Sequence, residues 1–136
     1  MLKEEVVRGM LRLAQDITKR KHLEVENLPE GKTVDQYFNE LIANATTVPT
    51  VDCVTKGYRI SIRPLGDSPE LCVSTVGDPG FELMCFSYTD SRWINGDYEH
   101  TGDFHIREIR INSYTSYKAL VAETYAMIDY VESHAN

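Results

Sequence analysis

The stretch "YRISIR", residues 58–63, alternates apolar and polar side chains along its whole length. In an extended chain Tyr58, Ile60 and Ile62 lie on one face, while the arginines and the serine lie on the other. Such a period of two is typical of a strand whose sheet covers a core on one side only. The stretch therefore predicts a β-strand with one buried and one solvent-facing side.

The same period of two extends in both directions from this strand, over Val48 to Ile111. Turn-forming residues interrupt it at 55–57, 65–69, 77–80, 95–96 and 101–103. Short strands that are joined by tight turns pair with their neighbours in the sequence. The region predicts an antiparallel β-meander of about five strands.

Helical periodicity replaces the period of two on both sides of the meander. Residues 2–20 carry apolar side chains at spacings of three and four, as an amphipathic helix does. A second apolar stripe follows Thr33 and Gln36, which have the form of a capping box, and it ends near Ala45. Apolar residues recur at helical spacing again over 117–131. We expect two N-terminal helices, the meander and a long C-terminal helix, which together make an α+β fold.

Length and composition predict a single α+β domain that spans residues 1–136. Two domains would each be too small to bury a sizeable core. Apolar residues make up 42% of the chain and charged residues 26%, as in ordinary globular proteins. No segment approaches the roughly 18 consecutive apolar residues of a membrane span, and "MLKEEVVRGM" does not have the apolar core of a signal peptide. We expect a cytoplasmic protein with no membrane partner.

The cysteine content and the net charge limit the classes of function that the sequence allows. Cys53, Cys72 and Cys85 are odd in number, lie far apart in the sequence and have apolar neighbours. This usage predicts buried free thiols rather than disulfides. The formal net charge of -7 disfavours direct binding to a nucleic-acid backbone and favours a partner with a basic surface.

One strand of the meander, "FELMCFSY" at 81–88, is apolar at both parities. Both of its faces therefore need cover, which indicates a central strand. Helices of the same chain are one source of this cover, and a second subunit is the other. Because the chain is also rich in tyrosine, we expect a homodimer or a higher homo-oligomer.

The stretch "RWINGDYEHTGDFHIR" at 92–107 concentrates acids, two histidines and the only tryptophan. It has three interpretations: a metal site, a catalytic loop or the polar rim of a β-hairpin. Asn95 and Gly96 form a strong hairpin signal. The adjacent Glu99 and His100 would point to opposite faces of an extended arm, and the spacing matches no zinc or calcium pattern. We expect a solvated hairpin rim, with no metal and no cofactor.

Familiar enzyme motifs are absent from the sequence. It contains no glycine-rich phosphate loop, nucleophile elbow, Cys-x-x-Cys or His-Glu-x-x-His. A cysteine and a histidine that meet only in the folded chain stay open as a catalytic pair. The settings "LCV" and "MCF" are apolar, however, whereas a nucleophilic cysteine needs an electropositive, partly exposed setting. An enzyme is the less favoured class.

The first functional hypothesis is a non-enzymatic inhibitor or adaptor that acts by protein–protein contact. Acidic charge and aromatic side chains at the hairpin support it, and proteins of phage or mobile-element origin often work in this way. The candidate contact residues are Asp90, Trp93, Asp97, Tyr98 and Glu99.

The second hypothesis is a protein that binds, or hydrolyses, an anionic nucleotide-like ligand on the polar side of the sheet. Several arginines on one face can hold a phosphate or carboxylate bidentately. The alternative is that these arginines simply cover a solvated strand face. A bulge near Arg107 must be assumed before the last strand is assigned to that face. The candidate ligand-binding residues are Arg59, Ser61, Arg63, His105 and Arg107.

Overall fold

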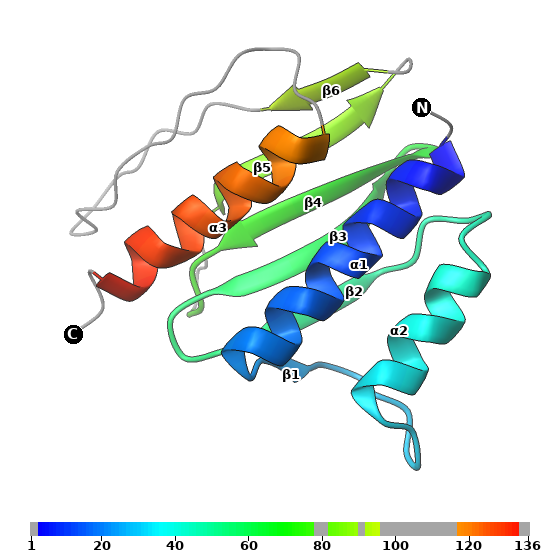
Figure 1. Ribbon diagram of the computed structural model, residues 1–136, viewed down its shortest axis with the longest axis horizontal. Helices are drawn as coiled ribbons and strands as arrows, with labels where there is room; N and C mark the ends of the chain where they lie inside the picture. The colour runs from blue at the N-terminus through cyan, green and yellow to red at the C-terminus, as the bar shows by residue number, and fades with distance from the viewer. Residues whose placement is uncertain (1–2, 78–81, 90–91, 96–116, 134–136) are drawn as a thin grey trace.

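The computed structural model describes residues 3–77, 82–89, 92–95 and 117–133. These residues form three helices and a six-stranded sheet (Figure 1). The helices are α1 (Lys3–Lys21), α2 (Val34–Ala43) and α3 (Tyr117–Ser133). The strands are β1 (Glu24–Val25), β2 (Val51–Val54), β3 (Arg59–Leu65), β4 (Ser68–Ser74), β5 (Glu82–Thr89) and β6 (Arg92–Asn95).

The predicted α+β class and the antiparallel meander are confirmed. Each strand pairs antiparallel with the next one in the chain, in the order β1-β2-β3-β4-β5-β6. One strand, β1, was not expected from the sequence. It has two residues, lies between α1 and α2, and pairs with β2. The last strand of the predicted meander, which ends at Ile111, lies outside the described residues.

The sheet has an apolar face and a polar face. Ile62, Leu71 and Phe86 are partners in one row across β3, β4 and β5, and all three are fully buried. In Figure 1, α1 and α3 both lie across the same side of the sheet, and they contact these central strands. The side chains of this row therefore form the core under α1 and α3. The polar face, on the other side, carries Asp52, Arg59, Ser61, Arg63, Glu70, Cys72, Cys85 and Ser87.

The start of α2 follows the predicted capping box. The backbone N–H of Gln36 donates to Thr33 Oγ1 at 3.1 Å, and the backbone N–H of Thr33 donates to Gln36 Oε1 at 2.9 Å. These bonds satisfy donors that a helix N-terminus leaves without intrahelical partners. The helix packs beside α1, where Gln15 Nε2 donates to Asp35 Oδ1 at 3.1 Å.

The two-sided burial expected for "FELMCFSY" is present in β5. Phe86 is fully buried on the core side, and Cys85, of the opposite parity, is only 3% exposed. The register shifts between Val73 and Ser74 of β4, so Leu83 is the extra, unpaired residue of a bulge in β5. Leu83 therefore joins the core cluster instead of sharing a face with Cys85. A single chain therefore buries both parities of this strand. The homo-oligomer stays a prediction.

No helix among the described residues is both long enough and apolar enough to cross a membrane. A cytoplasmic location stays a prediction.

Gly9 of α1 makes a close contact with the first residue of α3. The hydroxyl of Tyr117 donates to the Gly9 carbonyl oxygen at 3.1 Å, and a Cβ at Gly9 would lie 2.8 Å from Tyr117 Cε2. Alanine favours an isolated helix by about 1 kcal/mol over glycine. We nevertheless expect Gly9→Ala to lower the free energy of unfolding by about 1–2 kcal/mol in urea denaturation, because the ring must move.

The control is the same Gly9→Ala substitution made in a Tyr117→Ala variant. In a Tyr117→Ala chain the clash is gone, so the same change is expected to raise the free energy of unfolding by about 1 kcal/mol. A stabilising Gly9→Ala in the wild-type background would contradict the close packing of α1 on α3.

Candidate functional site

A pocket of about 300 Å³ opens on the polar face of the sheet. Its walls come from β3, β4, the start of β5 and the segment after β4. The pocket holds both signs of charge and a thiol. Its principal polar residues are Arg59, Ser61, Arg63, Glu70, Cys72 and Glu82.

Both arginines of the pocket contact carboxylates. Arg59 Nη1 lies 2.8 Å from Glu26 Oε2 and 3.4 Å from Asp52 Oδ1. Arg63 Nη2 lies 3.3 Å from the same oxygen of Asp52. The side chain of Arg63 is 56% exposed, whereas that of Arg59 is 27% exposed. Arg59 is therefore the more firmly held of the two, and Arg63 is the more accessible.

Asp52 of β2 joins these side chains into one network. Ser61 Oγ donates to Asp52 Oδ1 at 2.7 Å, and this oxygen also accepts from Arg63. Burial by itself would raise the pKa of Asp52, but the hydrogen bonds from Ser61 and Arg63 outweigh it and hold the pKa below its ordinary value. Asp52 is thus a carboxylate that compensates much of the positive charge of the arginines.

Three of the five residues predicted to bind a ligand come together here. Arg59, Ser61 and Arg63 all line the pocket, as the period of two in "YRISIR" predicts. The other two, His105 and Arg107, lie outside the described residues.

Sequence reasoning missed the acidic partners of these arginines. Asp52 lies opposite Ser61 in the register of β2 and β3, and Glu26 follows β1 directly. The available signal was the single charged residue in the otherwise apolar "VDCV". With Glu70 and Glu82, which also line the pocket, four acidic side chains face two arginines, so the local surface is acidic rather than basic.

The residues predicted to contact a partner protein are described in backbone only, and only in part. Trp93 lies in β6, where its backbone pairs with that of Tyr88. The other four, Asp90, Asp97, Tyr98 and Glu99, lie outside the described residues.

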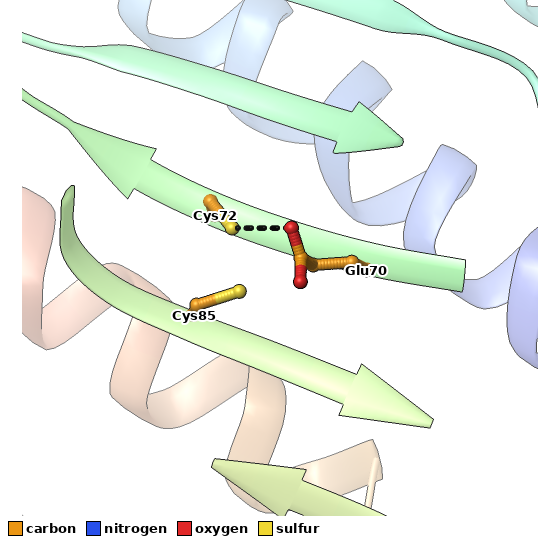
Figure 2. Close-up of side chains that lie close together, drawn as sticks. All are labelled: Glu70, Cys72 and Cys85. Carbon is orange, nitrogen blue, oxygen red and sulfur yellow. Dashed lines mark hydrogen bonds between the residues drawn. The ribbon is translucent and has the colours of Figure 1, made fainter. Parts of the chain in front are cut away.

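Two of the three cysteines are neighbours in space. Cys72 of β4 and Cys85 of β5 are direct partners in the register, and Glu70 lies beside them (Figure 2). The Cys72 thiol donates to Glu70 Oε1 at 3.3 Å, and Ser87 Oγ is 3.4 Å from Glu70 Oε2. All three cysteines are free and buried, as expected. The sequence analysis did not foresee that Cys72 and Cys85 lie side by side.

The surroundings of Cys72 and Cys53 disfavour the charged thiolate of each. The contact with Cys85, together with burial, raises the pKa of Cys72. Burial raises the pKa of Cys53, on the core face, to about 11. A raised pKa is the reverse of what activates a cysteine nucleophile.

No family model matches this chain. No curated protein and no solved structure matches it either. The functional argument therefore rests on the geometry of the polar face.

Proposed function

We propose that the protein is a non-enzymatic binding protein that holds a small anionic, nucleotide-like ligand in the pocket of the polar face. The observation that carries this proposal is the convergence of Arg59, Ser61 and Arg63 on one pocket. Two guanidinium groups and a hydroxyl can present several donors to one phosphate or carboxylate group.

The geometry of Arg63 supports a direct role in binding. Its distance of 3.3 Å to Asp52 is longer than the roughly 2.7–2.9 Å of a strong charge-assisted hydrogen bond. With more than half of its side chain exposed, Arg63 can turn its planar group toward a ligand, while Ser61 and Arg59 stay in contact with the largely buried Asp52. Arg59, held by Glu26 at 2.8 Å, fixes the wall of the pocket.

The protonation state of Cys72, the nucleophilic residue of the pocket, favours binding over catalysis. Cys72 lines the pocket, but its raised pKa keeps it a thiol. A thiol is a much weaker nucleophile than a thiolate.

Substitutions at Asp52 and Arg63 are expected to change anion affinity in opposite directions. Asp52→Asn removes the charge that competes for both arginines, so binding should tighten. Arg63→Ala removes a charge-assisted bond, so binding should weaken by about tenfold to a hundredfold. The probes are AMP, cyclic di-GMP and ADP-ribose. Thermal-shift assays select the strongest, and isothermal titration calorimetry measures its affinity.

Matched controls separate the pocket from general electrostatics. Asp35→Asn on α2 changes the net charge as Asp52→Asn does, but Asp35 pairs with Lys19 at 3.3 Å outside this pocket. Arg20→Ala on α1 serves in the same way for Arg63→Ala. Binding to none of the three probes by the wild type or by Asp52→Asn would overturn the proposal, as would equal effects of Asp52→Asn and Asp35→Asn.

A second proposal keeps the protein-contact function, because the sequence in and around β6 is rich in acidic and aromatic residues. An inhibitor or adaptor would use Trp93 in β6 together with the acidic and aromatic residues at 90–99, against a basic partner surface. Pull-downs from host lysate with the wild type and with Trp93→Ala test this. If the wild type and Trp93→Ala capture the same proteins, the hairpin does not form the contact surface.

A further inference from the structure

We infer that Glu70, Cys72 and Cys85 form a binding site for one thiophilic divalent cation, of which Zn²⁺ is the best match. The register sets two of the ligands, because Cys72 and Cys85 are direct partners on β4 and β5. Glu70 precedes Cys72 by two residues and so shares its face of the sheet. Figure 2 shows the two sulfur atoms and the carboxylate lying close together in one small area.

The distances are close to those of a tetrahedral zinc site. The candidate ligand atoms all lie within 4.8 Å of one another, and Cys72 Sγ is already 3.3 Å from Glu70 Oε1. Zinc binds sulfur at about 2.3 Å and carboxylate oxygen at about 2.0–2.2 Å, which sets neighbouring ligand atoms about 3.5 Å apart. Small side-chain rotations on a fixed pair of strands would complete the site.

The donor set selects the class of metal. Two sulfur atoms and one carboxylate suit zinc and other borderline or soft cations, whereas calcium and magnesium prefer oxygen ligands alone. Ser87 Oγ, at 3.4 Å from Glu70 Oε2, can orient the carboxylate so that its other oxygen faces the sulfur atoms.

The pocket gives this site an entry path and an open position. Glu70 and Cys72 line the pocket, so a cation can reach them from solvent although both cysteines are buried. Three protein ligands leave a fourth position for water or another small donor. The carboxylates of Asp52 and Glu26 compensate the nearby arginines, which reduces their repulsion of a cation.

The affinity of this site for a metal ion should depend on pH. Each thiol must lose its proton to bind the metal, so one bound Zn²⁺ displaces two protons. The apparent affinity is therefore expected to increase as the pH is raised from acidic toward neutral and mildly basic values.

The test is a titration of the reduced, full-length protein with Co²⁺ under anaerobic conditions. Thiolate ligation of Co²⁺ gives a charge-transfer band in the near ultraviolet, and tetrahedral geometry gives strong visible bands. We expect both to saturate at one equivalent and to disappear when Zn²⁺ is added. The titration contains no anionic ligand, so its result is independent of the proposed anion binding.

The three cysteines provide a matched set of variants. Cys72→Ala and Cys85→Ala are each expected to weaken Co²⁺ binding by at least a hundredfold. Glu70→Gln should weaken it about tenfold and keep the charge-transfer band. Cys53→Ala, which removes a buried thiol on the core face, should bind as the wild type does. Circular dichroism of each variant establishes that it is folded.

Two results would overturn the inference. One is a wild-type titration without a charge-transfer band. The other is a band that persists unchanged in the folded Cys72→Ala/Cys85→Ala double variant, because the metal would then be bound elsewhere.

Discussion

Phe86→Ala is expected to lower the free energy of unfolding by about 3–5 kcal/mol. Phe86 is fully buried in β5, where it lies opposite Leu71, and β5 contacts α3. Alanine would remove most of a large apolar side chain and leave a cavity that a paired strand cannot close. Because small domains are stable by only about 5–15 kcal/mol, the variant should be close to unfolding at room temperature. Urea denaturation followed by circular dichroism measures the loss.

The next residue of the same strand supplies the control. Ser87 is on the polar face and only half-buried. Ser87→Ala removes a weak contact with Glu70, and we expect it to change the free energy of unfolding by less than about 1 kcal/mol. Comparable losses from the two substitutions would contradict the assignment of faces in β5.

Tyr58 is expected to give changes of opposite sign with two substitutions. Its ring is 1% exposed, and its hydroxyl has no hydrogen-bond partner among the described residues. Burial also raises the pKa of Tyr58 to about 12, so the hydroxyl is neutral. Tyr58→Ala should lower the free energy of unfolding by about 3–5 kcal/mol through a cavity. Tyr58→Phe should raise it by about 1 kcal/mol, since it removes an unsatisfied buried polar group.

Tyr125→Phe is the matched comparison for the hydroxyl. The Tyr125 hydroxyl donates a hydrogen bond to Asp16 Oδ2, so its removal should lower the free energy of unfolding by about 1 kcal/mol. Chemical denaturation of both phenylalanine variants under identical conditions decides the matter. A loss at Tyr58→Phe equal to that at Tyr125→Phe would show that the Tyr58 hydroxyl is satisfied.

The fold could be predicted because its signals are local in the sequence. The period of two in "YRISIR" and the capping box at Thr33 each depend on residues that are close together. The strand and the capping box are confirmed, but Ser61, which was expected to face solvent, is buried. β1 was not predicted, because two residues are too few to show any period. The bulge at Leu83 was missed for a different reason: it changes the face of a residue without changing its chemistry.

The site was only partly predictable, because it depends on register. Alternation alone places Arg59, Ser61 and Arg63 on one face. Which residues lie across from them is fixed by the pairing of separate strands, so Asp52 was not assigned to the network. The same limit hid the contact between Cys72 and Cys85, which are far apart in sequence but directly opposite in the sheet.

The two long helices come from distant parts of the chain and lie side by side. Tyr117 contacts Gly9 near the start of both, and Lys21 Nζ lies 2.8 Å from Glu132 Oε1 near the end of both, so α1 and α3 run parallel. A ribosome releases α1 and strands β1 to β5 before it releases α3. Until then, the core face of β5 lacks the helix that covers it in Figure 1. A nascent chain stalled before Tyr117 would therefore present an uncovered apolar strand, which is the kind of surface that chaperones recognise.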